Sequence, residues 1–296
     1  PKPSRKRPWR ARASRSICDP MIGERAKERS FLDRGFAALP LLIPGLAGLV
    51  TLALFGAPQS YWLVNAGAMA AGLIWADMGR LPSGPPVAAV VVLVCIALFA
   101  LPLLKGPVVE GNARWLSLGG FTLHMGLTLI PLIAVLSAQD ARFGPFPLLV
   151  AIGVALLQPD AASTLALSGA ANGAAAADSA HRAAAIGAVG LLATATAILA
   201  PNPAPQAYVE RVIPDLWSAS PAMAILVSLS LIASVALILT APYAPKAPRF
   251  ALAGALGGFI LAALLADYPT PLVGYGAASI LGLALALPAI RKRERA

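Results

Sequence analysis

Long apolar runs, separated by short polar or Pro/Gly-rich breaks, make up most of this sequence. A helix that crosses a bilayer needs about 20 predominantly apolar residues, with a range of about 17–25. Ten runs approach that length: Phe36–Gly56, Tyr61–Asp77, Pro86–Leu104, Gly119–Ala138, Gly144–Gln158, Ala161–Ala177, Ala183–Ala200, Ser220–Thr240, Phe250–Ala266 and Pro271–Ile290. The pattern predicts an all-α polytopic membrane protein with about ten transmembrane helices.

The composition agrees with a membrane protein and argues against several other classes. Charged residues are 12% of the 296-residue chain, against about 25% in an ordinary soluble domain. Cys18 and Cys95 are the two cysteines, too few for a disulfide framework or a cysteine-based metal ribbon. With His124 and His181 as the two histidines, a histidine-rich metal site is also disfavoured. We therefore expect neither a metal ion nor a cofactor.

The net charge of +10 is distributed unevenly along the chain. Eleven of the 23 basic residues precede Phe36 and four follow Ile290. With ten spans, five more fall on the side of the termini and three on the opposite side: Arg80, Arg142, Arg182, Lys246 and Arg249, then Lys105, Arg114 and Arg211. Cytoplasmic loops of membrane proteins carry such an excess of Lys and Arg. Both termini are predicted to be cytoplasmic.

This topology divides the chain into a basic tail (1–35), a transmembrane domain (36–290) and a second basic tail (291–296). Basic segments beside a membrane are attracted to anionic lipids. A nucleic-acid-binding arm would be expected to interleave aromatic residues with the basic ones, and the first tail has only Trp9 and Phe31. We therefore expect the tails to contact anionic lipids and not nucleic acid.

Two outer loops, 105–118 and 201–219, are long enough to carry chemistry. In the first, Arg114 and Trp115 can anchor the loop at the membrane interface, or the guanidinium can bind a phosphate or carboxylate. The second contains Glu210, Arg211 and Asp215. A carboxylate there can act as a general base toward a sugar hydroxyl, or be an ordinary solvated charge.

Two motifs resemble those of the SEDS proteins, the FtsW, RodA and SpoVE type. The stretch Glu110-Gly-Asn-Ala-Arg-Trp-Leu-Ser-Leu-Gly-Gly-Phe121 is similar to the family's outer-loop signature. Leu156-Leu-Gln-Pro-Asp160 is similar to its Leu-Leu-Gln-Pro-Asp-x-Gly-Thr segment. The resemblance implies a SEDS-like helical bundle in the bacterial cytoplasmic (inner) membrane. It also implies that lipid II is polymerised into glycan strands outside that membrane, in partnership with a transpeptidase.

The resemblance also implies site residues. The family's catalytic Asp lies in the large outer loop between the seventh and eighth spans, where Asp215 is the best-placed candidate for the general base. Arg114, Trp115 and Asp160 are the candidate substrate-binding residues, with Arg114 assisting at the diphosphate of lipid II.

Several polar residues of the family pattern are replaced in this chain. His124–Leu127 stands where the family has Gln-Pro-Ser-Glu, Ile130 replaces a Lys, and Ala162–Ser163 replaces the Gly-Thr pair. Two hypotheses stay open: a divergent peptidoglycan glycosyltransferase, and a non-catalytic accessory subunit of a larger membrane complex. A transporter is a weaker alternative, because no span centre carries a convincing ion or proton relay.

Small residues recur at four-residue spacing in two of the predicted helices. Gly169 and Gly173 lie in the sixth run, and Gly254 and Gly258 lie in the ninth. Such spacing lets helix backbones approach closely in lipid, so we expect these glycines to mark packing seams.

Overall fold

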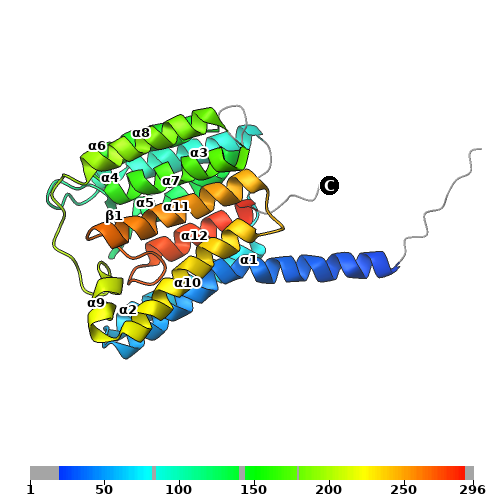
Figure 1. Ribbon diagram of the computed structural model, residues 1–296, viewed down its shortest axis with the longest axis horizontal. Coiled ribbons are helices and arrows are strands. Elements are labelled where there is room, and N and C mark those ends of the chain that lie inside the picture. Colours follow the sequence, from blue (N-terminus) through cyan, green and yellow to red (C-terminus); the bar gives the residue numbers. More distant parts are fainter. Residues whose placement is uncertain (1–19, 82–84, 140–143, 179, 291–296) are drawn as a thin grey trace, which may run out of the picture.

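A computed structural model describes residues 20–81, 85–139, 144–178 and 180–290, which form a helical bundle with one small hairpin (Figure 1). The helices are α1 (Pro20–Leu54), α2 (Gln59–Met78), α3 (Pro85–Ala100), α4 (Pro102–Lys105), α5 (Met125–Gln139), α6 (Phe146–Leu157), α7 (Ala161–Asp178), α8 (His181–Ala197), α9 (Val212–Ala219), α10 (Pro221–Thr240), α11 (Lys246–Leu265) and α12 (Ala277–Ile290). The strands are β1 (Trp115–Leu118) and β2 (Phe121–His124). Each of the ten predicted spans overlaps a helix. Most of the predicted first tail (1–19) and all of the second (291–296) lie outside the described residues.

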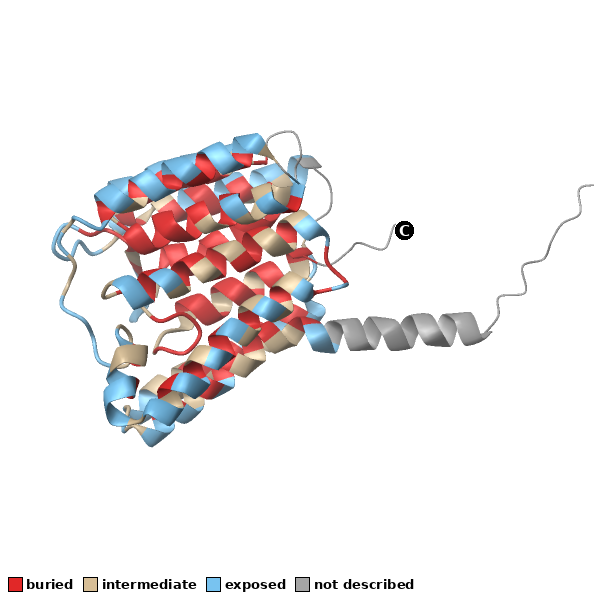
Figure 2. Ribbon diagram, viewed as in Figure 1, coloured by how far each residue is buried: buried red, intermediate tan, exposed pale blue. Residues whose placement is uncertain are grey.

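The outside of the bundle is suited to lipid. Within the described residues, four helical segments are long and apolar enough to cross a membrane: Gly35–Leu54, Pro86–Lys105, Pro221–Thr240 and Lys246–Leu265. Many leucine, isoleucine and valine residues are exposed. Exposed positions lie on the outer faces of the helices, whereas buried positions gather on the inner helices (Figure 2). Apolar side chains at such positions are stable when hydrocarbon surrounds them. The protein is a multi-pass membrane protein, as the apolar runs predicted.

Helices α5, α7, α11 and α12 form the centre of the bundle. Helix α5 is buried on nearly every side from Met125 to Ser137. It packs against α11 and α12, and α7 packs against both α8 and α11. Helices α1 and α2 contact one another, and each also contacts α12. An element that is apolar on all sides is expected at the centre of such a bundle.

The predicted small-residue seam lies between α7 and α11. A Cβ atom added to Gly169 would clash with the carbonyl group of Gly254, and the reverse substitution would clash with that of Gly169. Gly173 faces the backbone of Phe250 and Gly258 faces that of Leu165 in the same way. The absence of Cβ atoms therefore brings the two helix backbones into direct contact.

The predicted fourth span is wrong at its beginning. Residues 119–124 belong to an antiparallel hairpin in which Trp115 pairs with His124 and Leu118 pairs with Phe121. Gly119 and Gly120 form its turn with φ values of +55° and +90°. A two-residue hairpin turn of this kind needs positive φ at both positions, which glycine adopts without steric cost. Helix α5 therefore begins only at Met125.

Other boundaries also differ from the prediction. Helix α1 begins at Pro20, inside the predicted tail. The third span breaks before Pro102, which cannot donate the N–H that would continue α3. The tenth begins at Ala277 and not at Pro271, because Asn65 binds the preceding turn. Its side chain donates to Gly274 O and accepts from Gly276 N, both at 3.0 Å.

Candidate functional site

Loops from several parts of the chain meet at one end of the bundle. The Asn112 side chain donates to Pro201 O at 2.8 Å, and Tyr208 Oη donates to Phe55 O at 2.8 Å. The backbone N–H of Thr270 donates to Val209 O at 2.9 Å. All these loops lie on the side that the charge asymmetry assigns to the outside. In Figure 1 the segment between α8 and α9 runs across this end.

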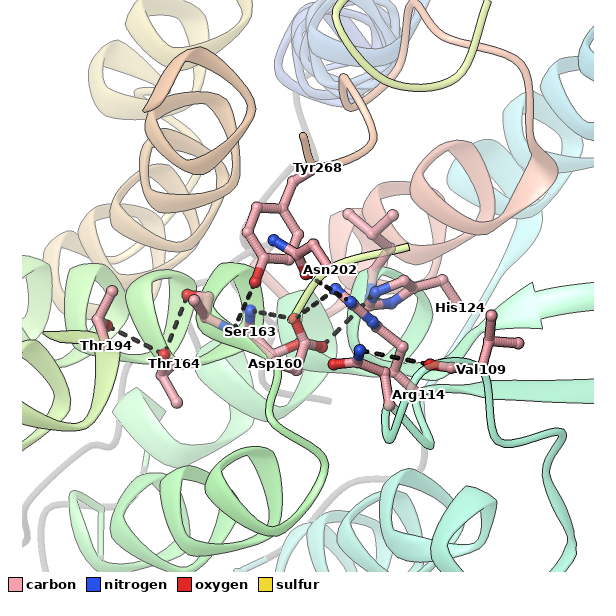
Figure 3. A network of polar contacts seen from close by, with 12 residues as sticks. Val109, Arg114, His124, Asp160, Ser163, Thr164, Thr194, Asn202 and Tyr268 are labelled. Carbon is pink, nitrogen blue, oxygen red and sulfur yellow. Dashed lines mark hydrogen bonds and ion pairs between the residues drawn. The ribbon is translucent and has the colours of Figure 1, made fainter. Parts of the chain in front are cut away.

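Asp160 lies beneath these loops, and its carboxylate is fully buried. It caps α7: Oδ1 accepts the backbone N–H of Ser163 at 3.1 Å, and Oδ2 accepts the Ser163 hydroxyl (Figure 3). A carboxylate at an N-cap satisfies free N–H groups and interacts favourably with the helix dipole. The Gln-Pro-Asp motif therefore ends α6 and begins α7 with a buried negative charge.

Arg114 supplies the opposite charge and is only 2% exposed. Its Nη1 lies 3.9 Å from Asp160 Oδ1, and its Nη2 donates to Asn202 Oδ1 at 2.8 Å. The guanidinium also lies over two rings, 4.8 Å from the centre of Trp115 and 5.1 Å from that of Tyr268. Tyr268 Oη in turn accepts the N–H of Ala161 at 3.2 Å. The contacts thus involve both outer loops and the first residues of α7.

His124 completes the cluster, which we call the charge centre (Arg114, His124 and Asp160). Its Nε2 lies 3.6 Å from Asp160 Oδ2, and its Nδ1 accepts the N–H of Leu127 at 3.3 Å. Because Nδ1 accepts a hydrogen bond, the ring proton belongs on Nε2, facing the carboxylate. Gly126 leaves the space that this arrangement needs, since a Cβ there would clash with Ser163 Oγ.

Several buried polar atoms around the charge centre have no hydrogen-bond partner in the described part of the chain. They include Arg114 Nε, His124 Nε2, Asn112 Oδ1 and Gln158 Oε1. Buried polar groups are normally hydrogen-bonded, and an unpaired one costs about 1–3 kcal/mol. The hydrogen-bonding capacity of the centre is therefore only partly used.

The structure brings three of the four sequence-predicted site residues together, namely Arg114, Trp115 and Asp160. It places Asp215 elsewhere, on α9, where the residue is exposed and its Oδ1 lies 3.7 Å from Arg211 Nε. Arg211 also binds Asp267, with Nη1 3.4 Å from Oδ1. Within the described residues, no hydrogen bond or ion pair joins Asp215 to the charge centre. The role of Asp215 as a base stays a prediction.

The sequence-predicted site residues do not include three residues that contact the charge centre, namely Ser163, Asn202 and Tyr268. The predicted fourth span also placed His124 in a helix, whereas the structure places this residue at the end of β2 beside Asp160. The Pro-Asn-Pro sequence around Asn202 signals an extended loop and says nothing about a partner. Only the packing of the helices makes these residues neighbours.

Glu210 is a second carboxylate near the charge centre. It is half-buried in the loop that leads to α9, where Oε2 accepts the N–H of Gln206 at 2.8 Å. Burial raises the pKa of Glu210 above its ordinary value of 4.5, and nearby Asp267 adds to the rise. This rise in pKa is opposed by hydrogen bonds from the backbone N–H groups of Gln206 and Glu210 and by the positive charge of Arg114. The net effect favours the protonated form in the folded protein.

We expect Glu210→Gln to stabilise the protein at neutral pH and to have no such effect in acid. A raised folded-state pKa means that stability is greatest below the unfolded-state value and is lost as pH rises through the folded-state value. Glutamine has the shape of the protonated acid and avoids this loss. Melting temperatures of the two proteins at about pH 7.5 and about pH 4 test the prediction. An equal difference at both pH values would contradict it.

Comparison with known proteins connects this geometry to a fold. No family model and no curated protein sequence matches the chain. Solved structures do: a mutant of the Thermus thermophilus rod shape determining protein RodA has a TM-score of 0.57 and 20% identity, covering 86% of this chain and 94% of that one. Thermus thermophilus RodA itself has a TM-score of 0.57 and 19% identity over 86% and 93%.

A chain from a peptidoglycan synthase complex that coordinates polymerization and crosslinking has a TM-score of 0.58 and 22% identity, covering 86% of this chain and 96% of that one. The likeness extends over nearly the whole length of each matched chain, so it concerns the complete helical bundle. The two short motifs had predicted the same fold. This chain has the SEDS fold, the fold of RodA.

Proposed function

We propose that the protein is a divergent peptidoglycan glycosyltransferase of the bacterial cytoplasmic membrane, which polymerises lipid II at the outer face. One observation carries the proposal: in a RodA-like fold, the motif residues Arg114 and Asp160 form a buried ion pair under the loops of the outer end. The same end carries the exposed carboxylate of Asp215 on α9. A positive group suited to a diphosphate and a carboxylate suited to a sugar hydroxyl thus lie at the same end of the bundle.

In this proposal Asp215 removes the proton from the attacking sugar hydroxyl. The sugar oxygen forms a bond to the anomeric carbon of a second lipid-linked sugar, and the bond from that carbon to the diphosphate oxygen breaks. Negative charge then accumulates on the leaving diphosphate, where a guanidinium is well suited to bind it. Arg114 has that role, Trp115 orients its guanidinium by stacking, and Asp160 holds it in position.

Polymerisation of labelled lipid II by the purified full-length protein, alone and with a candidate transpeptidase partner, tests the proposal. We expect Asp215→Ala to reduce polymer formation by about 10²–10⁴-fold, the usual contribution of a general base. Asp267→Ala is the matched control, because Asp267 is the other carboxylate bound to Arg211. Full activity of Asp215→Ala would show that Asp215 is not the general base. Equal losses of activity in Asp215→Ala and Asp267→Ala would show that both substitutions act by disturbing the loop around Arg211.

An accessory subunit is the second candidate, and the enclosure of the charge centre favours it. Arg114 is 2% exposed and Asp160 is not exposed at all, so in this conformation the pair holds the loops together and reaches no substrate. The same polymerisation assay separates the two functions. No polymer under conditions in which a related enzyme is active would support the accessory role, and a membrane partner such as a transpeptidase would then be sought by co-purification.

A further inference from the structure

Arg114 has one guanidinium edge that is only half occupied. The Nε and Nη2 atoms of an arginine lie on the same edge and together bind two oxygens of one carboxylate or phosphate group. Here Nη2 donates to Asn202 Oδ1, whereas Nε is buried and has no hydrogen-bond partner among the described residues. Asp160 lies beside Nη1, away from this edge. The edge best suited to an oxyanion therefore carries a single neutral amide oxygen.

The amide oxygen comes from a segment that is weakly attached. Residues 201–205 make two hydrogen bonds to the rest of the described chain, from Asn112 to Pro201 O and from Arg114 to the Asn202 side chain. Proline at positions 201, 203 and 205 removes three backbone donors and keeps the segment extended. Firm backbone pairing begins only at Tyr208 and Val209, which accept N–H groups of Tyr275 and Thr270. Residues 201–205 can therefore lift without disturbing the pairing that follows.

We propose that Asn202 is a gate on a diphosphate-binding edge of Arg114. With substrate absent, its side-chain oxygen occupies Nη2 and its segment covers the guanidinium. A diphosphate displaces it, because two anionic oxygens satisfy Nε and Nη2 together while the amide satisfies only one. This inference rests on the substrate class of the proposed function and adds the residue that controls access to Arg114.

The charge balance of the site agrees with this exchange. Asp160 neutralises the Nη1 side of the guanidinium and is itself held by Ser163, so it does not need to move. A phosphate bound at the Nε–Nη2 edge thus meets an unsatisfied Nε–H group and, within the described residues, no ion-paired carboxylate.

Binding measurements on the full-length protein in nanodiscs test the gate without requiring polymerisation. The probes are a radiolabelled polyprenyl diphosphate and inorganic pyrophosphate. We expect Asn202→Ala to bind the diphosphate about tenfold more tightly, because a hydrogen bond to a charged group no longer competes. Asn202→Asp, whose carboxylate competes more strongly, should bind it about tenfold more weakly. Gln206→Ala, which removes an exposed amide from the same loop, is the control and should bind like the original protein.

Two further results complete the test. Arg114→Lys keeps a positive charge but has no bidentate edge, so it should lose the response to position 202, with its melting temperature measured to confirm folding. If Asn202→Ala binds both pyrophosphate and the polyprenyl diphosphate more tightly, the diphosphate group alone is recognised. If it binds only the polyprenyl diphosphate more tightly, the lipid chain also contributes to recognition. Equal affinities of Asn202→Ala and the original protein would overturn the gate. If the substitutions at position 202 change the diphosphate affinity as expected but no lipid II polymer forms, the proposed function is wrong and the gate is still supported.

Discussion

Replacing Asp160 by asparagine is expected to lower the free energy of unfolding by about 3–5 kcal/mol, the usual cost of leaving one member of a buried ion pair without its partner. Asparagine keeps the size of the side chain and an oxygen that can accept the Ser163 N–H, so the cap on α7 is retained. What is lost is the negative charge beside Arg114. SDS-induced unfolding of the protein in mixed micelles measures the difference.

Two further variants test whether the loss of stability comes from leaving the charge of Arg114 unpaired. Asp160→Asn combined with Arg114→Met should recover most of the loss, since neither charge then remains buried alone. Asp215→Asn should change the stability by less than about 1 kcal/mol, because Asp215 is 61% exposed and its ion pair with Arg211 lies in solvent. If Asp160→Asn alone unfolds like the original protein, the buried pair does not hold the outer loops together.

The helical architecture was predictable because each span needs a long apolar run and each cytoplasmic loop needs basic residues. The hairpin was not predicted, because Trp115–Leu118 and Phe121–His124 are as apolar as the start of a span. The informative signal was Gly119-Gly120, a pair that can form a two-residue turn with positive φ at both positions. The apolar content of a segment therefore predicts that a helix is present but does not predict the residue at which it begins.

The candidate site was only partly predictable, for a different reason. Arg114 and Asp160 were identified because each belongs to a recognisable motif. Asn202 and Tyr268 come from loops 88 and 154 positions after Arg114 in the sequence, and no local pattern links them to it. Their contacts depend on how α7, α8 and α11 pack, and that packing is set by small residues whose partners the sequence does not identify.

The packing seam gives the second large effect: Gly254→Ala is expected to destabilise the protein by about 1–3 kcal/mol, the usual cost of overpacking. The added methyl group would lie 2.6 Å from the carbonyl carbon of Gly169. Backbone atoms cannot rotate away as a side chain can, so α7 and α11 must separate. Thermal unfolding of the purified variant measures the loss.

Gly257→Ala is the matched control on the same helix. A Cβ atom at Gly257 meets nothing within 4 Å, and alanine is favoured over glycine in a helix by up to about 1 kcal/mol. This variant should therefore be as stable as the original protein or slightly more stable. Equal destabilisation by both substitutions would mean that the close approach at Gly254 is not what limits stability.

The same seam connects packing to the charge centre. Helix α7 begins directly after Asp160, and α11 ends shortly before Tyr268, whose hydroxyl accepts the Ala161 N–H and whose ring lies over Arg114. Separation of the two helices by Gly254→Ala should therefore loosen the enclosure of Arg114 as well. We expect faster hydrogen exchange at the Ala161 N–H, which donates to Tyr268 Oη, in Gly254→Ala but not in Gly257→Ala. Unchanged exchange in both would show that the outer loops hold the centre independently of the seam.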